Sequence, residues 1–223
     1  MHPLIELMRP TEWYKNITVV LGILLALLYN PGILISPLTF SIVLLASICL
    51  SSANYVLNAI TDVKSDKHNP LKSKRPLPRG SVSMRMAHHF QLCLLIIGFI
   101  LALYVNIPVF LICGLLVLAA QLYNIPPLRL KDISYMDVIS ESVNNPLRFL
   151  IGWYAFNPGM PPIQLILFFW TSGAALMSHK RLMELQKGPL HRKVLKQYSK
   201  TALQAATILY GLVSALLLML VIL

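Results

Sequence analysis

The sequence predicts an all-α, polytopic membrane protein with about seven transmembrane helices. Two observations carry this prediction. First, 57% of the 223 residues are hydrophobic and only 12% are charged, which is too apolar for an ordinary soluble domain. Second, the apolar residues form long, continuous, Leu-rich runs instead of the alternating segments of a membrane β-barrel. No linker divides the sequence, so we expect residues 1–223 to form one domain.

Seven apolar segments have roughly the length that a membrane helix needs, which is about 20 residues. They cover residues 13–35, 38–60, 86–104, 107–123, 133–156, 163–185 and 202–223. The first segment gives the weakest signal, because Asn30 and Pro31 interrupt it. The others are continuous, and several of them end in clusters of polar residues.

The basic residues lie on one side of the predicted bundle. None of the 19 Lys and Arg residues falls in the connections 29–37, 104–108 and 157–162. Positively charged connections usually remain in the cytoplasm. We therefore expect an integral protein of the plasma membrane, with the N-terminus and the active site cytoplasmic and Leu223 outside.

The net charge of +11 is thereby concentrated on one face of the membrane. Such a face suits anionic lipid headgroups, and it equally suits a phosphorylated substrate. A nucleic acid partner is not expected, because the sequence contains no separate soluble basic module to present the charge.

The end of the second predicted helix carries a stripe of polar side chains. Asn54, Asn58, Asp62 and Asp66 follow one another at intervals of four, which places them on one helical face. Two carboxylates at this spacing repel each other, and a divalent cation between them reverses that interaction. Mg²⁺ is usually held by one or two carboxylates together with waters and substrate phosphates. The stripe therefore fits a Mg²⁺ site at Asp62 and Asp66, although a solvated helix end has the same spacing.

Cations follow this stripe directly. The segment "HNPLKSKRPLPRG" contains Lys72, Lys74, Arg75 and Arg79 on a chain that three prolines stiffen. Fixed cations beside a metal site form a pocket for a polyanion, and arginine adds bidentate recognition of phosphate oxygens. We therefore expect this region to bind a diphosphate at the membrane surface.

A second polar cluster, "SHKRLMELQ", closes the segment 163–185. Lys180 and Glu184 are spaced for an ion pair along a helix, and so are Arg181 and Glu184. Such pairs contribute only a few tenths of a kcal/mol, so the cluster alone specifies little.

A third cluster lies in the segment 133–156. If this segment is one helix, Asp137, Glu141 and Arg148 share a face with Asn144 or Asn145. Ionisable groups in a membrane span are costly, so they should point inward and meet partners. The pattern fits a structural network of these residues as well as a catalytic one.

Three motifs, in this order along the chain, resemble those of the UbiA superfamily of membrane prenyltransferases. They are "MRPTEWYKN", the "N-x-x-x-D-x-x-x-D" that begins at Asn58 together with "RPLPRG", and "YNIPPLRLK". The resemblance covers nearly the whole chain. It implies a helical bundle around a central cavity open to the cytoplasmic side, two Mg²⁺-associated polar motifs on that side, and a lateral opening for a polyprenyl chain.

Within the superfamily, the second polar motif separates two activities. Prenyltransferases usually carry a pair of aspartates there, which hold a second metal on a prenyl diphosphate, whereas this chain has "HKRLMEL". This motif and "HNPLKSKRP" resemble the decaprenyl-phosphate phosphoribosyltransferase-like branch, as does "RKVLKQYSKTAL". The resemblance implies a phosphorylated donor, phosphoribosyl pyrophosphate, and a polyprenyl lipid acceptor, a polyprenyl phosphate.

Two features depart from the superfamily pattern. The usual Asn-Asp pair is Asn58-Ala59 here, so one carboxylate is missing and the number of metal ions is open. The seven predicted helices are also fewer than the superfamily usually has. Three interpretations are open: the branch member is minimal, a partner subunit completes the cavity wall, in a homo-oligomer for example, or the activity is impaired.

The resemblance assigns roles to the candidate residues. Asp62 and Asp66, helped by Asn58, hold Mg²⁺ and the pyrophosphate of the donor. Basic residues neutralise the charge of the leaving group and grip the other phosphates, and Glu184 fixes the cations beside it. The substrate-binding candidates are Lys72, Arg75, Arg79, Lys180, Arg181, Glu184, Lys15, Arg9, Arg129, Lys131, Asn54 and Arg148.

Two other classes of function compete with phosphoribosyl transfer. The first is transfer of a prenyl group from a prenyl diphosphate to an aromatic or glycerol-phosphate acceptor, which predicts an acidic second motif. The second is a small transporter, channel or structural subunit. A transporter should carry polar residues towards the outer face, whereas the outer halves of the predicted helices are almost wholly apolar.

Overall fold

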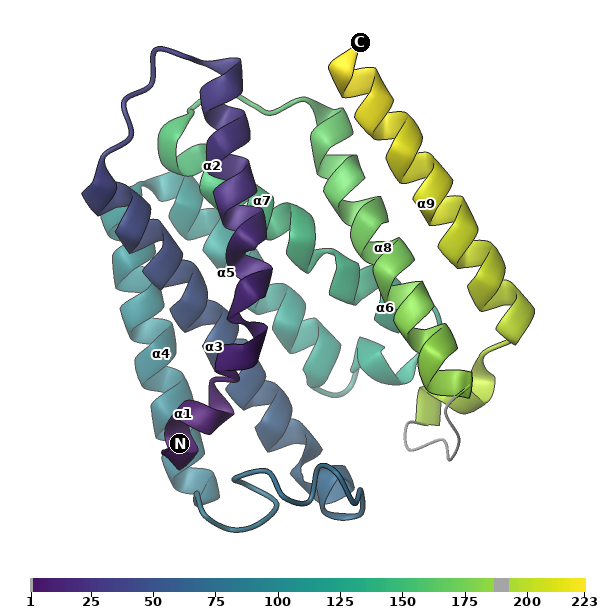
Figure 1. Ribbon diagram of the computed structural model, residues 1–223. Helices are drawn as coiled ribbons and strands as arrows, with labels where there is room; N and C mark the ends of the chain where they lie inside the picture. The colour runs from purple at the N-terminus through teal and green to yellow at the C-terminus, as the bar shows by residue number, and fades with distance from the viewer. Residues whose placement is uncertain (1, 187–192) are drawn as a thin grey trace.

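A computed structural model describes residues 2–186 and 193–223 of the chain. These residues form a bundle of helices (Figure 1). The α-helices are α1 (Pro3–Leu7), α2 (Ile17–Tyr29), α3 (Pro37–Lys67), α4 (Met84–Val105), α5 (Ile107–Asn124), α6 (Met136–Ser142), α7 (Asn144–Phe156), α8 (Ile163–Gln186) and α9 (Lys200–Ile222). Short 3-10 segments are η1 (Pro10–Asn16), η2 (Leu130–Asp132) and η3 (Lys193–Gln197).

The all-α membrane architecture predicted from the sequence is confirmed. Five segments of the described chain are long and apolar enough to cross a membrane: η1 with α2, then α3, α4, α5 and α9. Helices α7 and α8 belong to the same bundle but do not meet this criterion, since α7 has only 13 residues and α8 is more polar. The protein is therefore an integral membrane protein. Of the seven predicted spans, five have the length and hydropathy to cross a membrane.

The predicted helix 133–156 is wrong as a single helix. The chain breaks at Val143 into α6 and α7, and Tyr135, with a φ of 67°, precedes the first residue of α6. Pro146 explains the break, because its ring clashes with the carbonyl of Ser142 in a continuous helix and it cannot donate a hydrogen bond to that carbonyl. The first predicted span is also shorter than expected, since α2 ends at Tyr29 and Asn30 caps it.

Helices α2 and α7 cross at two glycines. A Cβ atom added to Gly22 would lie 2.1 Å from the carbonyl oxygen of Phe149, and one added to Gly152 would lie 1.9 Å from that of Val19. Small residues at helix crossings let backbones approach closely, which drives helix association in membranes. The crossing fixes α2 against α7, behind which α3 and α5 complete an apolar core.

The two ends of the bundle differ in chemistry. The N-terminus, the connection from α3 to α4 and the connection from α5 to α6 lie at one end, and the C-terminus lies at the other (Figure 1). A second apolar cluster joins α6, α8, η3 and α9 through Val138, Leu182, Leu195 and Leu203. This packing holds the end of α8 against α6, and the polar ends of α3 and α8 lie at the same end of the bundle (Figure 1).

Candidate functional site

The polar stripe of α3 forms as the sequence predicts, because α3 continues to Lys67. Asn54 donates from Nδ2 to the carbonyl oxygen of Leu116 at 3.5 Å, which ties the stripe to α5. Asn58 accepts a hydrogen bond from Lys131 at 3.1 Å. The carboxylates Asp62 and Asp66 follow on the last two turns of the helix, and each is surrounded by cations from elsewhere in the chain.

Asp62 is held by the segment between α5 and α6. Its Oδ1 lies 2.9 Å from Nη2 of Arg129 and 2.7 Å from Nζ of Lys131. Lys131 also donates to Oδ1 of Asn124 at 2.8 Å. Burial lowers the pKa of Lys131, while the neighbouring carboxylate of Asp62 opposes this shift. Residues distant in sequence therefore build this part of the site around one aspartate.

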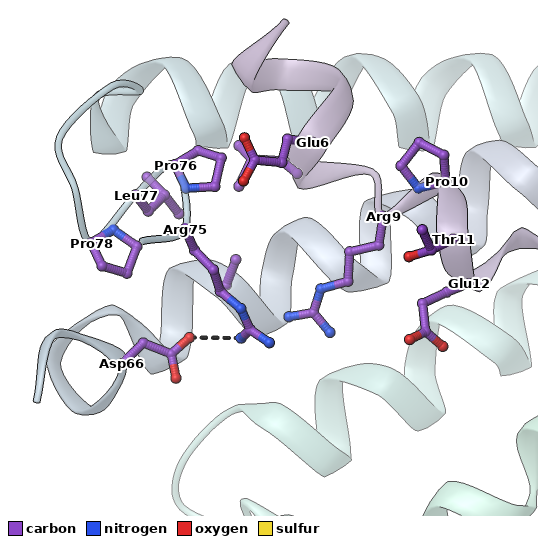
Figure 2. Close-up of a pocket in the computed structure, with 12 residues that line it drawn as sticks. Glu6, Arg9, Pro10, Thr11, Glu12, Asp66, Arg75, Pro76, Leu77 and Pro78 are labelled. Carbon is purple, nitrogen blue, oxygen red and sulfur yellow. Dashed lines mark hydrogen bonds and ion pairs between the residues drawn. The ribbon is translucent and has the colours of Figure 1, made fainter. Parts of the chain in front are cut away.

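Asp66 is more deeply buried, with a side chain only 3% exposed, and the proline-rich connection to α4 covers it. Its carboxylate lies 2.9 Å from Nη1 of Arg75 and 3.4 Å from Nζ of Lys72. Figure 2 shows the cavity beside it, about 270 Å³ in volume, between α1, η1 and the residues 75–78. Ala59, which stands where the superfamily usually has a carboxylate, lines this cavity.

Arg9 faces Arg75 across the cavity of Asp66 (Figure 2). Burial lowers the pKa of the Arg9 guanidinium, and the like charge of Arg75 lowers it further. Nη2 of Arg9 is buried without a hydrogen-bond partner among the described residues, and the guanidinium lies 5.6 Å from the ring centre of Tyr55. Two arginines that face one cavity, one of them with a free donor, provide a place for an anion.

A second cavity, of about 130 Å³, lies at the centre of the bundle, and we call it the central cavity. Asp62 lines the central cavity, Asp66 lines the other, and Arg9 and Glu12 line both. The basic residues around it are Arg9, Lys15, Lys131, Arg148, Lys180 and Arg181, and the acidic ones are Glu12, Asp62 and Glu141. Six cations against three carboxylates make this a cavity for anions.

The donor set also fits a magnesium ion that is shared with a substrate. The described residues contain no cluster of three or more His, Cys, Asp or Glu side chains that could hold a metal alone. Asp62 and Asp66 offer carboxylate oxygens one helical turn apart, and the amide oxygen of Asn58 lies one turn further. Mg²⁺ is commonly bound by one or two carboxylates, with water and phosphate oxygens as its other ligands.

The end of α8 is organised around Arg181, which is 1% exposed. Its Nε lies 2.6 Å from Oδ2 of Asp137 on α6, and its Nη1 lies 2.9 Å from Oε2 of Glu184. The hydroxyl of Tyr198 donates to Asp137, and the pKa of Tyr198 is raised by burial and by this contact. Two carboxylates balance the charge of Arg181 in a sealed position.

The predicted network of Asp137, Glu141 and Arg148 does not form among the described residues, because the chain breaks at Val143 and each of the three side chains has a different partner. Asp137 pairs with Arg181, Glu141 accepts from Nδ2 of Asn144 at 3.3 Å, and Arg148 donates to Ser51 at 3.4 Å. Arg79 is also not brought to either cavity. Its Nη2 pairs with Glu6 at 2.9 Å, and its side chain is 40% exposed.

The other candidates meet at the site. Lys15 pairs with Glu12 at 2.8 Å and lines the central cavity with Asn54 and Lys180. Sequence reasoning missed Tyr198, Ser51 and Asn124. Two of them carried a signal, since Asn124 stands inside the "YNIPPLRLK" motif and Tyr198 stands inside "RKVLKQYSKTAL", whereas Ser51 carried none.

Arg9 and Arg129 share an unusual backbone conformation. Both have positive φ angles, 52° and 35°, in the left-handed region, and each immediately precedes a 3-10 segment. This conformation turns the chain sharply before η1 and η2, so that Arg9 reaches the cavity of Asp66 and Arg129 reaches Asp62.

A third cavity, which we call the side groove, lies between η1 and α2 on one side and α8 on the other, next to the break between α6 and α7. Its volume is about 420 Å³. Polar residues such as Asn144 and Lys180 line its inner part, and Tyr14, Ile17 and Leu176 line it with exposed side chains. Gly173 lets α8 approach the break, because a Cβ there would lie 2.2 Å from Nδ2 of Asn145.

Comparison with curated proteins gives relatives with different activities. Decaprenyl-phosphate phosphoribosyltransferase of Mycolicibacterium smegmatis is 25% identical over 227 residues, which cover 94% of this chain and 69% of that protein. Digeranylgeranylglyceryl phosphate synthase of Sulfurisphaera tokodaii is 27% identical over 145 residues, which cover 61% of this chain and 49% of that protein. The chain thus spans between 49% and 69% of the length of these two relatives.

Solved structures share the fold. A UbiA homologue from Archaeoglobus fulgidus, bound to GPP and Mg²⁺, superposes with a TM-score of 0.79 at 20% sequence identity, covering 98% of this chain and 78% of that one. A model of the UbiA prenyltransferase family matches residues 19–223. The family model and the common bundle together show that this chain belongs to the UbiA prenyltransferase family, whose members are membrane transferases.

Proposed function

We propose that this protein transfers phosphoribose from phosphoribosyl pyrophosphate to a polyprenyl phosphate with the help of Mg²⁺. The observation that carries the proposal is the charge of the central cavity. Even without Arg181, whose charge Asp137 and Glu184 balance, five cations line this cavity against three carboxylates. Both proposed substrates are anions, and the donor carries phosphate at two ends. The end of α8 supplies Lys180 and Arg181 to this cavity instead of a second pair of aspartates.

The relatives support the same proposal. The phosphoribosyltransferase of M. smegmatis matches 94% of this chain, whereas the digeranylgeranylglyceryl phosphate synthase of S. tokodaii matches 61%. Relatives named for other activities match 75% and 82% of the chain, so the coverage adds weight only together with the cationic motif at the end of α8.

In this mechanism the pyrophosphate of the donor binds at the end of α3. Mg²⁺, held by Asp62, Asp66 and Asn58, would neutralise phosphate charge. Lys131 and Arg75 pair with the two aspartates. Lys131 is fully engaged by Asp62 and its other partners, so it would contribute its charge from a fixed position, whereas Arg75 would turn its remaining donors to phosphate oxygens as negative charge grows on the leaving group. Stabilising that charge in a site with little water is usually the largest catalytic contribution.

The bond changes need no proton transfer. The bond from ribose C1 to the pyrophosphate oxygen breaks, and its electron pair leaves with the pyrophosphate. An oxygen of the polyprenyl phosphate forms the new bond to C1 from the opposite face, which inverts that carbon. An anionic phosphate is already a nucleophile, so no general base is required. Burial within the bundle excludes water, which would otherwise hydrolyse the donor.

On α8, Lys180 and Arg181 have different roles in the proposal. Lys180 lines both the central cavity and the side groove, where it is placed to bind a phosphate. Arg181 is held by Asp137 and Glu184, so it acts as a positioning residue that fixes the end of α8 beside the cavity. The site is proposed to face the cytoplasm, because the basic connections lie at this end of the bundle.

Prenyl transfer is the second candidate. The solved structure from A. fulgidus was bound to GPP and Mg²⁺, and its fold is shared here. The side groove, with exposed apolar residues along it, would accommodate an isoprenoid chain of a donor as well as of an acceptor.

One experiment separates the two candidates. Purified protein with Mg²⁺ is offered phosphoribosyl pyrophosphate and a polyprenyl phosphate, or a prenyl diphosphate with aromatic and glycerol-phosphate acceptors. We expect pyrophosphate release and a lipid-linked phosphoribose with the first pair. Consumption of the prenyl diphosphate alone would replace the proposal with prenyl transfer.

A further inference from the structure

Arg148 is a buried cation without a counter-ion. It lies in the second turn of α7 and is 6% exposed. Its Nη2 donates to Oγ of Ser51 at a long distance of 3.4 Å, and its Nε is buried without any hydrogen-bond partner. Within the described chain, no carboxylate forms an ion pair with it. Arg181 is equally buried but has two carboxylates at 2.6 and 2.9 Å.

A guanidinium in this state is costly in a membrane protein. Ionisable groups inside a bilayer normally pair with one another, and an unpaired one marks a substrate or ion pathway. The two carboxylates that line the side groove together with Arg148 have other partners, because Glu12 pairs with Lys15 and Glu141 accepts from Asn144. The free Nε therefore calls for an anion that arrives from outside the chain.

The position of Arg148 indicates which anion this is. Arg148 lines both the central cavity and the side groove, so it lies at the boundary between them. The central cavity contains Asp62 and Lys131, where the donor binds under the proposed function. The side groove runs outward between exposed apolar side chains of η1, α2 and α8, among them Tyr14, Ile17 and Leu176. A ligand that spans this boundary has an anionic head and an apolar tail.

We propose that Arg148 binds the phosphate head of the lipid acceptor, whose isoprenoid tail lies in the side groove. Arginine presents its donors in a planar fork that matches two oxygens of a phosphate. The contact would orient the remaining phosphate oxygens towards the central cavity and the ribose carbon of the donor. This inference deepens the proposed function, on which the identity of the acceptor rests.

The test measures binding in the absence of any donor. Farnesyl phosphate and farnesol are titrated into the purified full chain in detergent, with the unaltered protein, Arg148→Met and Arg148→Lys. Met fills a similar volume without charge, and Lys keeps the charge but loses the fork. Arg79→Gln is the matched control, because Arg79 lies outside both cavities and the groove.

We expect Arg148→Met to weaken farnesyl phosphate binding by about ten-fold to a hundred-fold, as for the loss of a charged hydrogen bond. Farnesol binding should change by less than about two-fold, Arg148→Lys should lie between, and Arg79→Gln should change neither. Inorganic phosphate at equal concentration should not displace farnesyl phosphate, because it lacks the tail. Should Arg148→Met fail to fold, Arg148→Lys and the comparison of the two lipids on the unaltered protein decide.

Equal losses for farnesyl phosphate and farnesol, or no loss for either, would overturn the assignment of Arg148. Displacement by inorganic phosphate alone would also overturn it, because the groove would then contribute nothing. The donor assay is separate from this measurement. If Arg148→Met loses only the phosphorylated lipid but phosphoribosyl pyrophosphate is not consumed, the proposed donor is wrong and Arg148 remains the lipid phosphate site. If the donor is consumed and Arg148→Met binds normally, this inference alone fails.

Discussion

The polar ends of α3 and α8 hold opposite arrangements of charge. At the end of α3, each carboxylate is surrounded by two cations, Arg129 and Lys131 for Asp62 and Lys72 and Arg75 for Asp66. At the end of α8, one cation, Arg181, is surrounded by two carboxylates, Asp137 and Glu184. Both clusters lie at the same end of the bundle.

The two arrangements differ in how completely the charges are balanced and sealed. Arg181 and Asp137 are 1% and 0% exposed, and Tyr198 completes the contact. The cations around Asp62 and Asp66 outnumber the carboxylates, and the side chains of Arg129 and Arg75 are 25% and 35% exposed. An excess of accessible cations can turn to a phosphate, whereas a balanced, sealed pair cannot. From this comparison we infer that the cluster at the end of α3 binds phosphate, whereas the cluster at the end of α8 stabilises the packing of that helix.

The largest effect on stability should come from removing the buried ion pair between Asp137 and Arg181 at the end of α8. Asp137→Ala leaves the guanidinium of Arg181 buried beside a single carboxylate, which should lower the free energy of unfolding by about 3 to 5 kcal/mol. Thermal unfolding in detergent measures this loss. The double variant Asp137→Leu with Arg181→Met should recover most of it, because apolar residues replace both charges. An unchanged unfolding midpoint for Asp137→Ala, with weaker donor binding, would make Arg181 a binding residue and break the comparison.

Asp62→Asn should affect turnover instead of stability. It removes a carboxylate from the proposed Mg²⁺ and diphosphate site, so we expect pyrophosphate release to fall by about a hundred-fold or more. The unfolding midpoint should move little, since the partners Arg129 and Lys131 keep other contacts. Asp132→Asn is the matched control, because Asp132 also pairs with Arg129 but is 47% exposed and lines no cavity of the site. Comparable rates for the two variants, at saturating Mg²⁺, would remove Asp62 from the mechanism.

The smallest effects compare two arginines of the same proline-rich connection. Arg75 pairs with the buried carboxylate of Asp66 and lines its cavity, so Arg75→Gln should raise the apparent KM for the donor by about ten-fold. Arg79 makes an exposed pair with Glu6, so Arg79→Gln should change KM by less than about two-fold. Steady-state kinetics with varied donor measures both. Equal effects would mean that the whole connection, and not the Asp66 cavity, binds the donor.

Local patterns allowed part of the site to be predicted. The interval of four between Asn54, Asn58, Asp62 and Asp66 determines a helical face wherever the helix continues, and α3 does continue to Lys67. Length and hydropathy likewise predicted the long spans. Such features depend on neighbours within a few residues, which the sequence displays directly.

Pairing between distant segments could not be predicted in this way. Arg181 meets Asp137, 44 residues earlier, and Tyr198 reaches the same carboxylate across 61 residues. The interval from Asp137 to Arg148 suggested a common face of one helix. Pro146 breaks that helix into α6 and α7, and the two residues then have separate partners. The proline was visible in the sequence, yet its consequence depends on how α6 and α7 pack against α8.

The backbone conformation of Arg9 and Arg129 costs free energy of folding, which their ion contacts alone do not show. A residue with a side chain is strained in the left-handed backbone region by about 1 to 3 kcal/mol, whereas glycine adopts it readily. Stability alone would favour glycine at both positions, yet arginine stands at each, one in the cavity of Asp66 and one against Asp62. Backbone energy is therefore stored where the charges are placed. A redesign with glycine at both positions would relax the two turns and raise folding stability, but it would remove the two arginines from the site. At these positions the protein therefore trades thermal stability for activity.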